Sequence, residues 1–136
     1  MTTFNDLTVL LTITQAKYDQ QQLSFQKLVT EENRLREELS RLDRAAREAH
    51  AEPEGTNEMR AIGADIIWQG WVARSKTQLN LKLAKVLALK LHHLEQVKRA
   101  YGKVLVVQEL LAKTAKEATR KSASTALSQA IDHTLF

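Results

Sequence analysis

In the first third of the chain one mainly apolar series of positions recurs at alternating steps of three and four, and this alternation does not slip from Leu7 to Ala49. A repeat that averages 3.5 residues predicts a helix whose apolar seam packs against a second helix in a left-handed supercoil. We therefore predict a helix over residues 6–50, capped by Asn5 or Asp6. The seam consists of Leu7, Leu11, Thr14, Tyr18, Gln21, Phe25, Leu28, Glu32, Leu35, Leu39, Leu42, Ala46 and Ala49.

Three members of this seam are polar: Thr14, Gln21 and Glu32. The usual role of a polar residue in such a seam is to fix the register and orientation of the two helices at some cost in stability. Alternatively, these side chains face polar groups on a partner.

The signals for a turn gather in residues 51–57, which contain the only proline, Pro53, and Gly55. Thr56 or Asn57 can cap the helix that follows. No comparable signal occurs for some sixty residues, so a second helix is predicted over residues 58–121, followed by a Ser/Thr/Ala-rich tail at 122–136 that frays. Its seam is Val72, Leu79, Leu83, Val86, Val97, Val104, Val107 and Leu111.

The second helix has more apolar surface than one neighbour can cover, because leucines such as Leu87, Leu91 and Leu94 widen its stripe. If the chain folds back about residues 53–54, residue 7 lies opposite residue 100. Residues 101–111 would then project past the first helix as an apolar docking surface. The predicted fold is thus a single all-α domain, a long antiparallel two-helix coiled coil (a helical hairpin) with a longer second helix. A break at Gly102, which would fold residues 103–131 back into a three-helix bundle, is the structural alternative.

Charge is divided unevenly between the two predicted helices. Residues 1–58 contain seven Lys or Arg and eleven Asp or Glu, whereas residues 59–136 contain thirteen and five. Packed side by side, the helices would place opposite charges along their rims, with a basic excess on the second. These cations are spread around the helix and no aromatic platform accompanies them, which makes nucleic-acid binding the minority interpretation.

The sequence offers little for catalysis, metal binding or a cofactor. It has no cysteine, and adjacent histidines such as His92 and His93 point about 100° apart on a helix and cannot share a metal as an i, i+4 pair does. The spacing of the carboxylates is typical of a solvent-exposed helix face. The sequence also contains no glycine-rich loop that could bind a phosphate group. No apolar run is long enough to span a bilayer, so we expect a non-enzymatic, cytoplasmic protein that binds other proteins.

Trp68 and Trp71 form the most unusual local feature. Tryptophans three residues apart lie on adjoining faces of one helical turn. Both could pack at the hairpin end of the coil, but the seam opposite thins to Ala46 and Ala49, which leaves room for one large ring. We therefore expect at least one tryptophan to be partly exposed and to act as an interface anchor.

These features together resemble the small coiled-coil stalk proteins of flagellar and type III secretion export, the FliJ/YscO type. The resemblance covers nearly the whole chain. It rests on the heptad-bearing first helix, the short turn, and a longer second helix that opens with Arg60, Trp68 and Trp71 and continues through KTQLNLKLAKVLALKLHHLEQVKRAYGK. Two tryptophans beside the seam and a basic second helix depart from the better-known members.

The resemblance implies a cytoplasmic adaptor, peripheral at the cytoplasmic face of a membrane export machine, that looks like the central stalk of a rotary ATPase. Such proteins dock the end bearing both termini in a hexameric export ATPase, turn the hairpin end toward the membrane export gate protein, and in some cases escort export chaperones. Carried over by position, the gate-facing residues would be Leu39, Leu42, Trp68, Val72, Ser75 and Leu79, and residues near Leu7, Leu11, Val104 and Leu111 would enter the ATPase. The expected exposed ring and the predicted overhang add Trp71, Tyr101 and Leu105 to the partner-binding residues. A basic nucleic-acid-associated helix and a self-associating structural coiled coil that forms a homodimer remain the alternatives.

Overall fold

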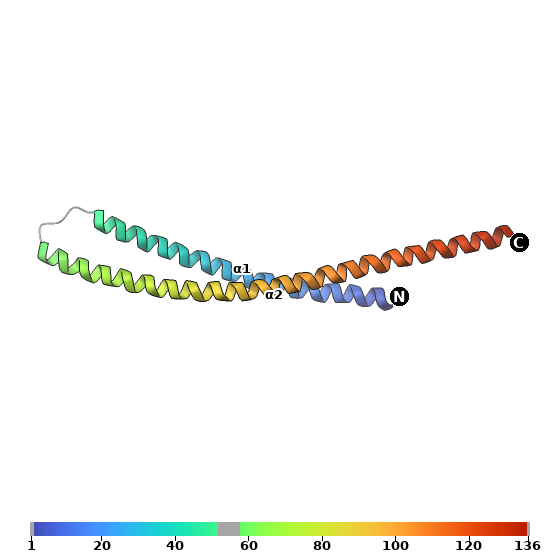
Figure 1. Ribbon diagram of the computed structural model, residues 1–136, viewed down its shortest axis with the longest axis horizontal. Helices are drawn as coiled ribbons and strands as arrows, with labels where there is room; N and C mark the ends of the chain where they lie inside the picture. Colours follow the sequence, from blue (N-terminus) through green and yellow to red (C-terminus); the bar gives the residue numbers. More distant parts are fainter. Residues whose placement is uncertain (1, 52–57, 136) are drawn as a thin grey trace. The chain divides into compact units, whose positions relative to one another are not determined.

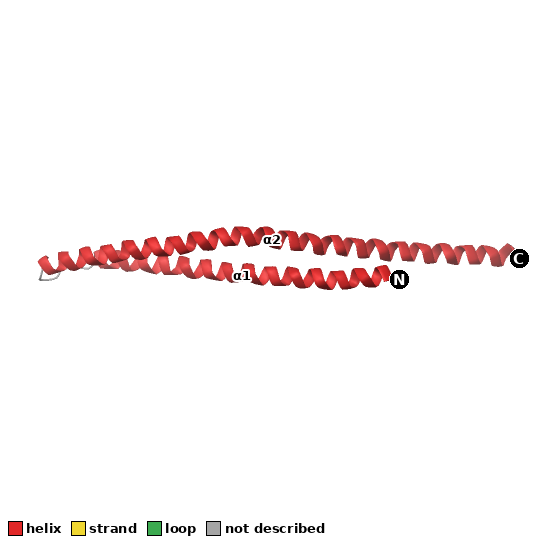
Figure 2. Cartoon of the chain, turned by 90° about the horizontal axis from the view of Figure 1, so that it is seen from below, coloured by secondary structure: helices red, strands yellow, loops and turns green. Residues whose placement is uncertain are grey.

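The computed structural model describes residues 2–51 and 58–135, with side chains for residues 3–49 and 62–135. Within these ranges the chain forms two helices, α1 (Thr2–Ala51) and α2 (Glu58–Leu135), which pack against each other, and no strand (Figures 1 and 2). The prediction of an all-helical chain with a longer second helix is confirmed, since α1 has 50 residues and α2 has 78. Pro53 and Gly55, on which the predicted turn depends, lie outside the described residues.

The composition of α1 explains how a helix of this length forms. It contains no proline or glycine and is rich in leucine, glutamine, glutamate and arginine, which are good helix formers. Its threonines are accommodated because their hydroxyls donate to the carbonyl four residues earlier, as Thr8 does to Phe4 and Thr12 to Thr8. The helix begins at Thr2, so Asn5 and Asp6 lie inside it, and the prediction that one of them caps it was wrong.

Helix α2 continues through Gly102, the position at which the sequence allowed a break. Gly102 lies in its interior, and no described glycine has a positive φ. The alternative of a chain that folds back at Gly102 is therefore wrong, because a lone glycine costs about 1 kcal/mol in a helix and does not by itself end one. The helix extends to Leu135, past the end predicted near residue 121, so the segment expected to fray is helical.

The chain divides into two compact units, and each contains part of both helices. The middle unit comprises the described residues between Leu23 and Leu94, and the end unit combines residues 2–22 with residues 95–135. In the middle unit Asp43 pairs with Lys76 and Glu32 with Lys90, so the two helices run in opposite directions. In the end unit the rings of Tyr18 and Tyr101 are in contact, with centroids 5.4 Å apart.

These pairs correct the predicted register. For each pair, the midpoint between the two residue numbers is near 60, which is the point about which the pairing is symmetric. The sequence suggested that this point lies at residues 53–54. Residue 7 is therefore expected opposite a residue near 113 instead of residue 100. The heptad pattern could not reveal this difference of about two heptads, because a shift by whole heptads keeps seam facing seam.

The core is a narrow line of side chains at the predicted seam positions. Leu35 and Val72 are buried in the middle unit, and Val104 and Val107 are buried in the end unit. Among the other seam residues of α1, Thr14 and Glu32 are also buried, Ala49 is exposed and the rest are partly buried. Burying a Val or Leu side chain completely stabilises a fold by roughly 1.5–3 kcal/mol, so these few residues dominate the packing.

The burial of Val104 and Val107 overturns the predicted overhang at residues 101–111. They are only 3% and 5% exposed, and Tyr101 contacts Tyr18 of α1. Because the register is centred near residue 60, α1 reaches farther along α2 than the sequence suggested, and the seam of residues 101–111 lies against it.

No helix in the described part of the chain is both long and apolar enough to cross a membrane.

Candidate interaction surface

Most of the residues predicted to bind an export gate contribute to packing between the helices of the middle unit. Val72 is buried, and five others are partly buried: Leu39, Leu42, Trp68, Ser75 and Leu79. Trp71, predicted as an interface anchor, is largely accessible, with 48% of its surface exposed. A partner could therefore contact Trp71 directly but would have to separate the helices to reach Val72.

The residues predicted to enter an ATPase ring show a similar division in the end unit. Val104 is buried, and Leu7, Leu11 and Leu111 are partly buried. Tyr101 and Leu105, which lie beside this seam, are exposed. The structure thus brings these residues together along one interface and leaves only its flank open to a partner.

Trp68 and Trp71 stack on one another on the surface of α2. Their ring centroids are 5.1 Å apart and the ring planes are 24° from parallel. Trp68 is partly buried, and its indole Nε1, which has no hydrogen-bond partner among the described residues, is buried. Trp71 is exposed, as the sequence predicted for at least one of the two rings.

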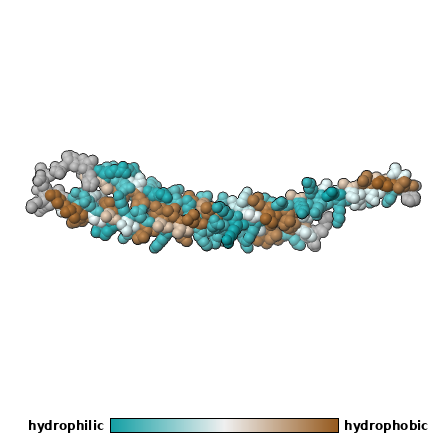
Figure 3. Space-filling view, in the orientation of Figure 1, coloured by the Kyte–Doolittle hydropathy of each residue, from teal (hydrophilic) through white to brown (hydrophobic). Residues whose placement is uncertain are grey.

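Three exposed isoleucines adjoin this pair along the beginning of α2. Ile67 and Trp71, four residues apart, share one face of α2 and form what we call the tryptophan patch, whereas Ile62 and Ile66 are exposed on another face. The space-filling view shows apolar surface in this part of α2 and again near its C-terminal end (Figure 3). Large apolar side chains that gather in the open are typical of protein-binding surfaces.

Two ion pairs join the helices of the middle unit. Lys90 donates to Glu32 at 2.8 Å, and its ammonium lies 6.0 Å from the centroid of the Phe25 ring. Lys76 contacts Asp43 at 2.5 Å. The hydrogen bond from Lys90 lowers the pKa of Glu32, and the one from Lys76 lowers the pKa of Asp43, because each stabilises the ionised carboxylate. Of the three polar seam residues, Glu32 therefore has a specific partner that can fix the register.

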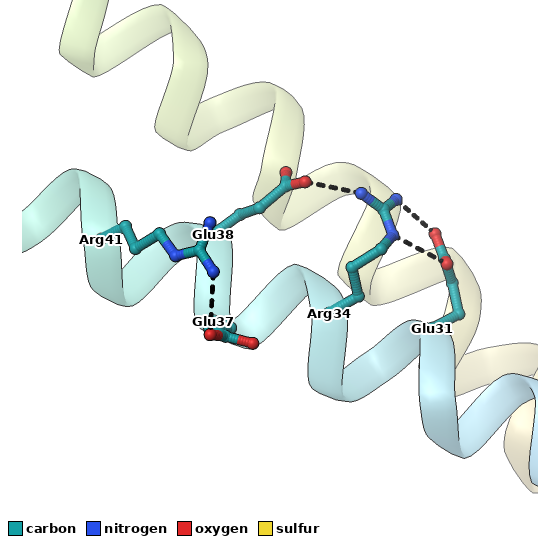
Figure 4. Close-up of polar contacts among 5 residues, drawn as sticks. All are labelled: Glu31, Arg34, Glu37, Glu38 and Arg41. Atoms are coloured by element: carbon teal, nitrogen blue, oxygen red, sulfur yellow. Dashed lines mark hydrogen bonds and ion pairs between the residues drawn. The ribbon is translucent and has the colours of Figure 1, made fainter.

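Other carboxylates of α1 are neutralised within their own helix. Arg34 lies between Glu31 and Glu38, at 2.6 Å from each, and Arg41 contacts Glu37 at 2.9 Å (Figure 4). The hydrogen bonds from Arg34 lower the pKa of Glu31. These pairs have the i, i+3 and i, i+4 spacings that support exposed helix faces, and such a face provides no enclosed site for acid–base chemistry.

The end unit differs in its electrostatics, because none of its described residues forms an ion pair although both signs of charge are present. A groove of about 400 Å³ opens between its helices and contains three cationic side chains, Lys17, Arg99 and Lys103, but no carboxylate. We call it the basic groove. Its other lining residues are Thr14, Gln20, Gln21, Gln96 and Ala100. An anionic group could therefore bind there without competing with an internal partner.

The end unit also contains a helical segment without lateral cover. A second groove, lined by Thr3 and Phe4 of α1 and by residues between Thr114 and Ser124 of α2, lies where α1 begins. Every described side chain from residue 115 to residue 135 is exposed. Leu127, Ile131 and Leu135 follow each other at steps of four, so they form one exposed apolar stripe, here called the tail stripe.

The histidines do not gather into a metal site in the described residues, where no group of three or more potential ligands occurs. The rings of His92 and His93 meet edge to face with centroids 5.8 Å apart.

Most of the predicted binding residues belong to the seam, and four exposed apolar residues were not predicted. Leu10, Ile13, Val106 and Leu110 lie outside the seam and are exposed in the end unit. A second stripe with the same alternation of three and four was the signal that could have revealed them.

A search of protein-family models, curated proteins and solved structures found no match to this chain.

Proposed function

We propose that the chain is a non-enzymatic stalk or adaptor protein of a flagellar or type III protein export apparatus, built as a long antiparallel two-helix coiled coil. In this proposal the end unit docks in a hexameric export ATPase at the cytoplasmic face of the membrane. The middle unit presents the tryptophan patch to the membrane export gate protein. Export chaperones are further candidate partners.

The observation that carries this proposal is the uncovered end of α2. Most of the stability of a helix in a protein comes from the packing of its apolar face against other elements. The tail stripe leaves three large apolar side chains open, Leu127, Ile131 and Leu135. A protein cavity that encloses the helix from several sides, such as the centre of a ring, would cover it.

The tryptophan patch supports the second contact. Trp71 is a large exposed ring held in place by its stack on Trp68. Because that stack restricts its motion before binding, less conformational entropy is lost when a partner covers it. Exposed aromatic residues of this kind are the usual anchors of protein interfaces.

The test is a pull-down of a hexameric secretion ATPase by the full chain, with ATP hydrolysis followed in parallel. We expect binding that stimulates hydrolysis and that Ile131→Glu weakens at least tenfold. The matched control is Gln129→Glu, which introduces the same charge in the same segment on the face opposite Ile131. Absence of binding, or equal losses in the two variants, would contradict the proposal.

A further inference from the structure

The end unit contains a second stripe on α1, separate from the seam that packs against α2. Asp6, Leu10, Ile13 and Lys17 follow each other at steps of four, three and four, and all four are exposed. At about 100° per residue these side chains share one face of the helix, about a quarter to a third of a turn from the seam residues Leu11 and Thr14.

Helix α2 has an equivalent stripe in the same unit. Arg99, Lys103, Val106 and Leu110 follow each other at steps of four, three and four and are also exposed. They lie on a face next to the buried seam residues Val104 and Val107. On α1 the two apolar residues therefore lie between Asp6 and Lys17, and on α2 the two apolar residues follow Arg99 and Lys103.

The basic groove shows that the two stripes lie on the same side of the end unit. Lys17 of α1 lines this groove together with Arg99 and Lys103 of α2. Since the helices are antiparallel, Leu10 and Ile13 continue from Lys17 in the same direction in which Val106 and Leu110 continue from Lys103. The four apolar side chains thus extend the basic groove into what we call the flank patch: Leu10, Ile13, Val106 and Leu110.

The size of the flank patch indicates the kind of occupant. The four side chains are each only 42–56% exposed, so together they offer far less surface than the area of about 800 Å² that each partner of a stable dimer buries. A second copy of the chain would thus find too little apolar surface there. One amphipathic helix, which presents two to three apolar side chains on its contacting face, would cover it.

The charges at one end of the flank patch indicate the sign of that occupant. No described residue forms an ion pair with the three cations of the basic groove, which are Lys17, Arg99 and Lys103. In the middle unit, by contrast, every acidic residue from Glu31 to Asp43 is paired with a cation. Carboxylates on a bound helix would complement these cations without displacing an existing pair. We propose that this face of the end unit binds an acidic amphipathic helix of another protein. The site is distinct from the tail stripe and does not depend on docking to an ATPase.

The test measures binding of the full chain to a synthetic acidic helix by fluorescence anisotropy. The probe is a peptide of about three heptads with leucine at positions a and d and glutamate at the flanking positions. We expect saturable binding, about tenfold weaker in Lys103→Glu and in Val106→Glu, and weakened by salt. Circular dichroism checks that each variant keeps its helix content, and Leu110→Gln provides a second test of the apolar part.

Matched variants separate this site from general charge attraction. Lys98→Glu makes the same change of charge on another face of α2, and Ala112→Glu introduces a charge on the opposite flank; both should bind the peptide as the parent chain does. Equal weakening by Lys98→Glu, or no binding of the peptide, would overturn the proposal. So would variant-sensitive binding to anionic vesicles or duplex DNA without binding to the peptide, or peptide-free dimerisation that Val106→Glu abolishes.

Discussion

Leu35 provides the sharpest test of how the two helices are held together. Its side chain is 0% exposed and is the largest one fully buried in the described part of the chain. Leu35→Ala removes three carbon atoms from that position. At about 0.8 kcal/mol for each buried carbon, the lost transfer free energy is about 2.4 kcal/mol, and the remaining cavity adds to it. Because a narrow interface can partly close, we expect a loss of about 2–3 kcal/mol in the free energy of unfolding.

The assay is urea unfolding followed by far-UV circular dichroism. With a denaturant slope of about 1.5–2 kcal/mol/M, the predicted loss moves the midpoint down by about 1–2 M. Leu23→Ala is the matched control, because Leu23 belongs to the same helix and the same unit but is 61% exposed. It should cost less than about 0.5 kcal/mol. The same substitution at both sites cancels the difference in helix propensity between leucine and alanine.

Similar losses in Leu35→Ala and Leu23→Ala would refute the reasoning. That result would mean that stability comes from the individual helices and that the seam in the middle unit contributes little.

The remaining predictions concern ionisation, helix propensity and ring exposure. Because Lys90 lowers the pKa of Glu32 below its unfolded value of about 4.3, the ion pair stabilises the fold above that pH and ceases to do so as the pH falls through the lower, folded pKa. Urea unfolding at a series of pH values should therefore show a loss of stability on acidification that is smaller in Glu32→Gln, and an unchanged profile would contradict the assignment. Gly102→Ala should raise the free energy of unfolding by about 0.5–1 kcal/mol, because a Cβ at this helical position meets no atom within 4 Å; a loss measured by urea unfolding would show otherwise. In single-tryptophan variants, acrylamide should quench Trp71 more strongly than Trp68, because Trp71 is 48% exposed and the indole nitrogen of Trp68 is buried, whereas equal quenching would mean that both rings are open to solvent.

The sequence was sufficient to predict the two helices and which residues form the packed face of each. A repeat of three and four places the same residues on one side of a helix whatever the helix meets, so the seam through Leu35, Val104 and Val107 followed from spacing alone. The exposure of one tryptophan also followed from local sequence, because two large rings could not fit opposite Ala46 and Ala49.

The register and the open surfaces could not be obtained in this way. Seams tolerate displacement by whole heptads, and the specific pairs of Glu32 with Lys90 and of Asp43 with Lys76 were not evident among many charged residues. Because of the error in register, residues 101–111 were predicted to be uncovered, whereas the segment whose side chains are all exposed is residues 115–135. The spacing of the seam says nothing about the other faces of a helix, so the exposure of Val106 and Leu110 was not predicted.

The uncovered end of α2 has a consequence for amide hydrogen exchange. Without a neighbouring helix, the backbone amides around Ile131 are protected only by the intrinsic helix–coil equilibrium of that segment, so they should exchange orders of magnitude faster than those around Leu35, whose opening requires the two helices to separate. Any protein that encloses this segment would slow that exchange selectively. The C-terminal amides can thus report a physiological partner before its identity is known.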